Sequence, residues 1–258
     1  MTKTVQDLWN DDAAYPIIKA TERHPFLVAM VDGTLPMKQF QYYVVQDALY
    51  LKDFAYCLRH LGEKRRSMKA NDATGSENYD ADADRLIAFA KGAEEAELSL
   101  HNSFFRQWNI DTTSSSNTVN LHPQMPHALL YTSYMKQVVV TRPYAEGLAV
   151  LLPCFWVYAH VGEIMLQLRT DLGTTVITRP PMYDAWIDMY GGDEFHQEVS
   201  EYKELVNQVL RTIGDDSATY AAMQQHFLMC CQLEYMFWDQ AMVCMTWPSI
   251  GGDAASRS

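Results

Sequence analysis

The chain has 258 residues, of which 48% are hydrophobic and 12% aromatic, so it can bury a sizeable core. Its net charge of -12 at pH 7 argues against nucleic acid or an anionic membrane as the main partner. The five cysteines are an odd number without the spacing of a disulfide framework or a C-x-x-C site, so we expect reduced thiols in a cytoplasmic protein.

The sequence carries the helical period over long stretches and has no convincing alternating strand. Asp32-Gly33-Thr34-Leu35-Pro36 and Gly191-Gly192-Asp193 carry the glycine and proline signals that end one helix and open the next. The predicted helices span roughly 5–31, 37–62, 80–109, 124–141, 144–169, 181–190, 194–213 and 217–246.

Polar composition predicts surface loops at 63–82 and 111–120 and a disordered tail at 251–258. The longest apolar run, 148–159, is interrupted by a proline and is shorter than the ~20 residues that span a bilayer. The N-terminal residues do not resemble a signal peptide. We therefore predict one all-α, single-domain helical bundle over residues 1–250, with no membrane partner.

An aspartate interrupts an aromatic stripe in the second predicted helix. Phe40, Tyr43, Asp47, Tyr50 and Phe54 follow one another at intervals of three or four residues, which places them on one helical face. A buried carboxylate is unfavourable unless something pairs with it. The partner of Asp47 is either a side chain, a hydroxyl or helix-terminal amides within the protein, or a ligand.

Two further reactive side chains lie on apolar faces of other predicted helices. Cys154 shares a face with Leu151 and Tyr158, and Glu234 shares one with Phe237. A cysteine in such a run is most often a small core residue, and a buried carboxylate most often has a structural partner. Several tyrosines whose phenols need a partner also point inward: Tyr43, Tyr50, Tyr131, Tyr134, Tyr158 and Tyr183. A cavity lined by these residue types would suit a small, flat, polar heterocycle.

Motifs for metals, phosphates and serine nucleophiles are absent from the sequence. We find no His-Glu-x-x-His, no di-iron helix motif, no glycine-rich phosphate loop and no nucleophile elbow. Glu97 and His101 lie one helical turn apart, which alone is weak support for a metal. No metal and no cofactor are predicted.

Six motifs occur in one order along residues 15–246. They are His24-Pro25-Phe26, Asp32-Gly33-Thr34-Leu35, Phe40-x-x-Tyr43-x-x-Gln46-Asp47-x-x-Tyr50-Leu51, Leu152-Pro153-Cys154-x-Trp156-x-Tyr158-x-x-x-Gly162, Tyr183-x-x-Trp186-Ile187-x-x-Tyr190 and Glu234-Tyr235-x-Phe237-Trp238-Asp239. Together they resemble the TenA family of thiaminase II proteins. The resemblance implies a haem oxygenase-like helical bundle, usually a homotetramer. It also implies a hydrolase of thiamin salvage that converts 4-amino-5-aminomethyl-2-methylpyrimidine to its hydroxymethyl analogue and in many members cleaves thiamin.

The resemblance also implies roles for individual residues. Cys154 corresponds to the nucleophile, Glu234 to the acid–base carboxylate, and Asp47 to the residue that hydrogen-bonds the aminopyrimidine, so its partner would be a ligand. The remaining substrate-binding residues that it implies are Tyr50, Tyr131, Tyr158, Tyr183 and Phe237. A thiolate can add to the electron-poor ring once a ring nitrogen is protonated, so these side chains are predicted to converge on one cavity.

This chain departs from the commoner pattern of the family in two places. One is the polar insertion after Glu63, and the other is Cys230-Cys231, where a serine is often found one turn before Glu234. Two other functions remain open. One is a related cofactor-synthesis oxidase of the quinone-cofactor branch, which the tyrosine- and carboxylate-rich pocket disfavours. The other is a non-catalytic regulatory or binding protein, which Cys154 and Glu234 argue against.

Overall fold

The computed structural model describes residues 3–71, 78–108, 123–172, 178–213 and 217–249, and this described part of the chain is all-α, as predicted. The predicted loop at 111–120 and the tail at 251–258 lie outside it. The elements are α1 (Val5–Trp9), α2 (Ala14–Thr21), α3 (Pro25–Val31), α4 (Met37–Met68), the 3-10 helix η1 (Lys69–Asn71), α5 (Tyr79–Gly92), the π-helix η2 (Ala93–Glu97), α6 (Leu98–Gln107), α8 (Pro126–Thr141), α9 (Tyr144–Asp171), α10 (Pro181–Tyr190), α11 (Asp193–Ile213) and α12 (Ser217–Met242).

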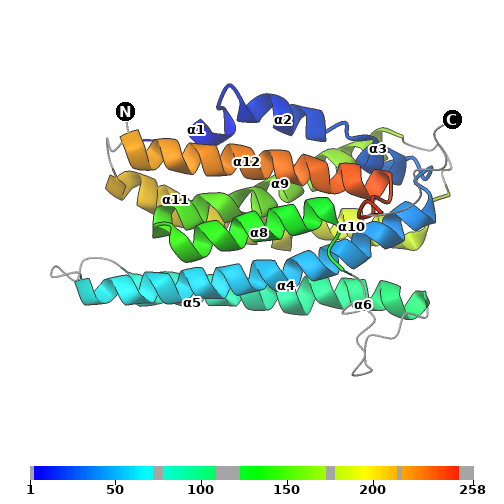
Figure 1. Ribbon diagram of the computed structural model, residues 1–258. Coiled ribbons are helices and arrows are strands. Elements are labelled where there is room, and N and C mark those ends of the chain that lie inside the picture. The colour runs from blue at the N-terminus through cyan, green and yellow to red at the C-terminus, as the bar shows by residue number, and fades with distance from the viewer. Residues whose placement is uncertain (1–2, 72–77, 109–122, 173–177, 214–216, 250–258) are drawn as a thin grey trace, which may run out of the picture.

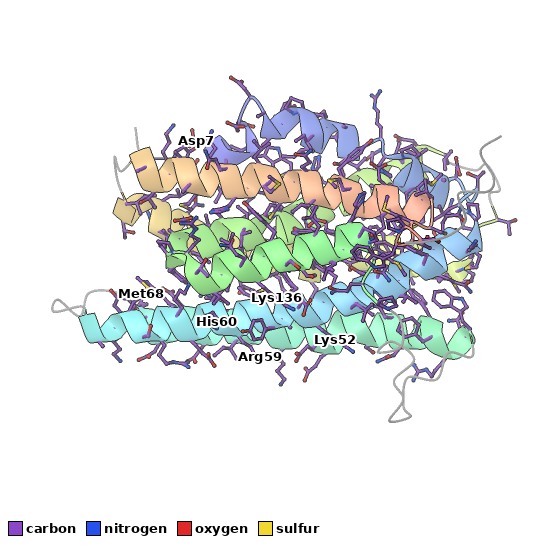
Figure 2. The ribbon with its side chains drawn as sticks, viewed as in Figure 1. Asp7, Lys52, Arg59, His60, Met68 and Lys136 are labelled. Atoms are coloured by element: carbon purple, nitrogen blue, oxygen red, sulfur yellow. The ribbon has the colours of Figure 1, made fainter. Side chains whose placement is uncertain are left out.

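The helices form two layers (Figure 1). The long helix α4 lies alongside α5 and α6 in one layer, and α8, α9, α11 and α12 make up the other. Helices α1 and α2 lie along the outer side of α12. Figure 2 shows Lys136 of α8 beside α4, where its ammonium group pairs with Asp53. The site described below lies where α4 meets the second layer.

Helix α9 is the central element of the bundle. It packs against α8, α10, α11 and α12 and also contacts α4. By length and hydropathy it could cross a membrane, but 78% of its apolar window is buried inside the protein, as in a core helix. Pro153 lies within this continuous helix and does not start a new one. Because α9 carries Cys154, that thiol is held at the centre of the molecule.

The prediction of one helix over 5–31 is wrong, because local hydrogen bonds divide the segment into α1, α2 and α3. Asp11 Oδ1 accepts a hydrogen bond from the Ala14 amide at 3.0 Å, which starts α2. His24 Nδ1 accepts one from the Phe26 amide at 3.1 Å, and a proline at the first position helps to start α3. The helical period continues through both turns, so periodicity alone hides them.

The predicted loop at 63–82 is also wrong over its described residues, because α4 continues to Met68 and α5 includes Asp82. Arg65 donates from Nε and Nη2 to Asp82 Oδ2 at 3.0 and 2.8 Å, and both side chains are less than one-tenth exposed. The Arg65 guanidinium also lies 4.3 Å from the centre of the Tyr79 ring. The charged residues of this segment therefore join two helices of an antiparallel hairpin. Figure 2 shows Met68 near its closed end.

Gly162 allows the closest approach between α9 and the turn that follows α10. A Cβ atom there would lie 2.4 Å from the carbonyl carbon of Tyr190 and 2.6 Å from the amide nitrogen of Gly191. Gly162→Ala should therefore push the two backbones apart and lower the free energy of unfolding by about 1–3 kcal/mol. Thermal or urea unfolding measures this loss.

Gly92→Ala is the matched control for this prediction. The Cβ of that variant would meet only the flexible end of Glu198, at 3.2 Å, in a helical glycine where alanine is the better helix former. Equal stability of the two variants would contradict the close approach at Gly162.

Candidate active site

Four of the predicted site residues, Asp47, Tyr50, Cys154 and Tyr158, line a small buried cavity between α4, α9, α10 and α11. Its volume is about 10 Å³, which is room for about one water molecule. Its lining residues are Asp47, Tyr50, Leu51, Phe54, Cys154, Phe155, Tyr158, Tyr190 and Phe195. A larger pocket of about 510 Å³ surrounds Arg65, but it contains none of the predicted site residues, so we place the site by its chemistry and not by its size.

Cys154 brings a half-buried thiol to the cavity wall. The preceding residue, Pro153, has no amide hydrogen, so one hydrogen bond of α9 is missing beside the thiol. Tyr50 lies opposite on α4 and forms a hydrogen bond with Cys154. Burial raises the pKa of Tyr50 well above its usual value, and the neighbouring Cys154 and Glu234 raise it further. Tyr50 therefore stays a neutral phenol next to the thiol.

Glu234 is the buried carboxyl group of α12, with only 1% of the residue exposed. The Tyr131 hydroxyl donates a hydrogen bond to Glu234 Oε1 at 2.7 Å, and the Tyr131 ring lies 5.0 Å from that of Tyr50. Burial raises the pKa of Glu234 to about 8, the hydrogen bond from Tyr131 lowers it, and the charge of Asp47 adds to the rise. Glu234 is therefore protonated at neutral pH. It does not line the cavity itself but is connected to it through Tyr131 and Tyr50.

Asp47 has a side-chain neighbour, His101 of α6, that sequence analysis missed. Asp47 Oδ2 lies 3.1 Å from His101 Nε2, and both side chains are almost fully buried. The resemblance implied that a ligand alone would pair with Asp47, and this needs correction, because a histidine already lies against it. Sequence analysis considered His101 only with Glu97, whose side chain lies outside the described residues. The sequence does contain a signal that His101 is buried: it lies one helical turn before Phe104 and Phe105, which are both buried.

Aromatic rings form most of the remaining wall. The hydroxyl groups of Tyr43 and Tyr158 are 3.3 Å apart. Burial, followed by the charges of Tyr43 and Asp47, raises the pKa of Tyr158 well above its usual value. Phe237 packs edge-on against Tyr50, with ring centres 5.7 Å apart, so it supports the wall from behind.

Tyr183 takes a different position from the other predicted site residues. Its hydroxyl donates to the Leu35 carbonyl oxygen at 2.8 Å, and its ring lies 4.7 Å from that of Phe40. It does not line the cavity.

Sequence analysis also did not single out Tyr190 and Phe195 as wall residues. Phe195 lines the cavity and also an open surface pocket of about 220 Å³ that includes Glu194 and Glu198.

Among the residues that the structure describes, no group of three or more His, Cys, Asp or Glu side chains is placed to hold a metal ion.

Comparison with known proteins identifies the family. The model of the TENA/THI-4/PQQC family matches residues 12–245. The aminopyrimidine aminohydrolase of Bacillus subtilis (strain 168) is 35% identical over 218 residues, which cover 84% of this chain and 81% of that protein. The aminopyrimidine aminohydrolase of Halalkalibacterium halodurans is 29% identical over 235 residues, 89% of this chain and 92% of that protein.

Solved structures show the same fold. A TenA homologue from P. horikoshii OT3 superimposes with a TM-score of 0.74 at 22% identity, covering 93% of this chain and 98% of that chain. A protein from Silicibacter sp. TM1040, described as a TenA family transcription regulator, gives 0.75 at 21% identity, covering 93% and 96%. The match to the family model and the 35% identity together show that this chain belongs to the TENA/THI-4/PQQC family.

Proposed function

We propose that the protein is an aminopyrimidine aminohydrolase that acts in thiamin salvage. Its main substrate is 4-amino-5-aminomethyl-2-methylpyrimidine, which it converts to the hydroxymethyl compound, and thiamin is a second substrate. The observation that carries this proposal is one buried cavity that is lined by the thiol of Cys154 and the carboxyl group of Asp47 and backed by the protonated Glu234. Two relatives that match most of this chain bear the name of this activity.

In the proposed reaction, Cys154 adds as a thiolate to a ring carbon, and the electron pair moves onto the ring, whose amidine edge is held by Asp47. The ring electrons then expel the amine from the exocyclic methylene, with a proton from Glu234, so that ammonia leaves. Water adds to the methylene carbon and returns a proton to Glu234. The thiolate departs and the ring regains its aromaticity. One amine and one water thus yield one alcohol and one ammonia.

The phenols and aromatic rings complete the proposed site. Tyr50, Tyr131 and Tyr158 are neutral donors, because burial raises the pKa of each well above its usual value. Phe237 stabilises the position of Tyr50, and Tyr183 acts through the packing of Phe40 without touching the substrate.

An oxidase of the quinone-cofactor branch fits less well. Such a protein binds an acidic ligand with histidine and arginine, whereas no lysine, arginine or histidine lines the described cavity. The charge of Asp47 would repel an anion, whereas Asp47 and the protonated Glu234 suit an aminopyrimidine, whose edge offers an amine and a basic nitrogen.

The proposed function also includes an assembly and a cellular compartment. We expect a cytoplasmic homotetramer. The five cysteines are free thiols, as expected in a reducing compartment, and large apolar side chains are exposed on α8 (Leu129, Leu130 and Val140). Light scattering after size-exclusion chromatography tests the tetramer, and a monomeric mass would contradict it.

The test of function is turnover by the purified protein. With 4-amino-5-aminomethyl-2-methylpyrimidine we expect ammonia and the hydroxymethyl product in equal amounts, measured by coupled assay and chromatography. Thiamin in a parallel reaction should release its thiazole. Tight binding of the pyrimidine without turnover would favour a regulatory or binding protein instead, and the absence of both would contradict the substrate class.

A further inference from the structure

The cavity that carries the proposed chemistry is much smaller than the proposed substrate. Its volume of about 10 Å³ holds about one water molecule, whereas a substituted pyrimidine displaces several times the volume of one water. Because protein interiors are close-packed, the neighbouring side chains cannot make this room by small adjustments. At least one residue of the wall therefore has to move before the ring can reach Asp47 and Cys154.

Most of the wall comes from α4 and α9, which are long helices in the centre of the bundle. Phe155 on α9 shows how firmly this part is held. Its ring packs against the rings of Phe54, Phe89 and Tyr202, with centres 5.2, 5.5 and 4.4 Å apart. These two helices also carry the carboxyl group and the thiol of the proposed reaction, so we do not expect them to open.

The rest of the wall is made by Tyr190, which ends α10, and Phe195, which lies in the first turn of α11. Phe195 is 8% exposed, the largest value among the aromatic residues of the wall. In the described part of the chain, the ring that packs against it is that of Tyr190, edge-on with centres 5.2 Å apart. Residues 191–192, just before its helix, are glycines without side chains that could hold the turn. Phe195 is therefore less firmly held than Phe155.

Phe195 also faces a pocket that is open at the surface. This pocket has a volume of about 220 Å³, and Gly92 of α5 and Met189 of α10 contribute to its lining. Among the described residues, Phe195 alone lines both this surface pocket and the cavity. The larger pocket around Arg65 shares no lining residue with the cavity. A shift of one side chain could therefore connect the cavity to the surface pocket.

The charge of the surface pocket suits the substrates that would pass through it. Its charged lining residues are all acidic: Asp188, Asp193, Glu194 and Glu198. The aminomethyl group of the aminopyrimidine is protonated at neutral pH, like other aliphatic amines, and the thiazolium ring of thiamin carries a permanent positive charge. Acidic groups attract both substrates, so size and not charge has to distinguish them at this point.

We propose that Phe195 is the specificity-determining residue at the entrance of the site. Its ring turns aside to let a substrate pass from the surface pocket into the cavity, and it closes once the substrate is bound. The aminomethylpyrimidine needs a small opening, whereas thiamin needs a larger one because it carries a second ring. Closure then limits the access of water to the reacting ring. The identity of the substrates in this inference rests on the proposed function.

The direct test is the rate at which uncharged thiol reagents label Cys154, followed by mass spectrometry of the peptide that contains it. Phe195→Ala should raise the rate with the bulky reagent N-phenylmaleimide at least about tenfold and the rate with the smaller iodoacetamide by less. The reason is that labelling follows the population of open molecules, and a bulky reagent needs the wider opening. Unchanged rates with both reagents would overturn the entrance at Phe195.

Phe195→Leu and Phe155→Leu form a matched pair for the same measurement. Both remove an aromatic ring from the cavity wall, but Phe155 does not line the surface pocket. F195L should label faster than wild type and F155L should not. Equal acceleration in the two variants would indicate a general loosening of the bundle and would contradict the proposal. This pair also serves if F195A does not fold.

Substrate selectivity is the second test. The ratio of kcat/KM for thiamin to kcat/KM for the aminomethylpyrimidine should rise at least about tenfold in F195A and fall by a similar factor in Phe195→Trp. A loss of folded protein or of catalytic power lowers both values and cancels in the ratio. A ratio that stays constant in both variants would overturn the role of Phe195 in specificity.

The labelling experiment does not need turnover, so it separates this inference from the proposed function. A wild type that turns over neither substrate would contradict the proposed function, while labelling would still test the entrance. A wild type that turns over the aminomethylpyrimidine, together with F195A that matches it in labelling and selectivity, would overturn the role of Phe195 alone.

Discussion

Replacing Cys154 with serine is expected to lower kcat for aminopyrimidine hydrolysis by at least ~10³-fold, because a serine hydroxyl at this position has no base to make it a nucleophile. Tyr50, which forms a hydrogen bond with Cys154, is a neutral phenol and not a base. Serine and cysteine have nearly the same shape, so the aromatic wall should remain and KM should change little. Steady-state kinetics with ammonia detection measures both constants.

Cys244→Ser is the matched control. This thiol is also free and partly exposed, but it follows α12 and does not line the cavity. We expect unchanged kinetics for C244S and similar unfolding curves for both variants. Unchanged turnover in C154S would remove the thiol from the mechanism. A loss of folding in C154S would return Cys154 to the role of a small core residue.

The helical period explains how much of the site could be predicted. Asp47, Cys154 and Glu234 are each out of place on an apolar face, and a helix that buries such a face must bring the odd side chain inside. The structure places Asp47 and Cys154 in one cavity wall and connects Glu234 to it through Tyr131. A reactive side chain on an apolar helical face was therefore enough to predict that these three residues lie inside the bundle.

Contacts between helices that are distant in sequence could not be predicted in this way. The pairing of His101 with Asp47 depends on how α6 packs against α4, and nothing in the local pattern of either helix fixes that packing. The ion pair of Arg65 and Asp82 is a second contact between helices that the local sequence does not predict. Charged composition predicts a loop at 63–82, whereas Arg65 and Asp82 pair between two helices, because composition does not show which partner a charge will meet.

Glu234→Gln is expected to make the protein less active and, at alkaline pH, more stable. Glutamine can still accept the hydrogen bond that Tyr131 donates to Glu234 Oε1 at 2.7 Å. It cannot give or take a proton, so kcat should fall by about 10²–10⁴-fold. Glu204→Gln, an exposed substitution on α11, should leave kcat unchanged.

The effect on stability has a definite sign and pH range. Burial raises the pKa of Glu234 from 4.5 to about 8. Between these values the folded protein keeps a proton that the unfolded chain has lost, so the folded state binds more protons. The contribution of Glu234 to the free energy of unfolding therefore falls as pH rises, by about 1.4 kcal/mol per pH unit. The contribution is complete below the unfolded pKa and is lost as pH rises toward about 8.

Glutamine removes this dependence, because it does not titrate. The free energy of unfolding of E234Q minus that of wild type should therefore increase with pH between about pH 5 and about pH 8, by up to about 5 kcal/mol in all. Urea unfolding of both proteins at several pH values measures the difference, and all other titrating groups cancel in it. Parallel curves would mean that Glu234 is already ionised in the folded protein. In that case the proton for the leaving amine would have to come from another group, and the neutral phenol of Tyr50 in the cavity wall would be the nearest candidate.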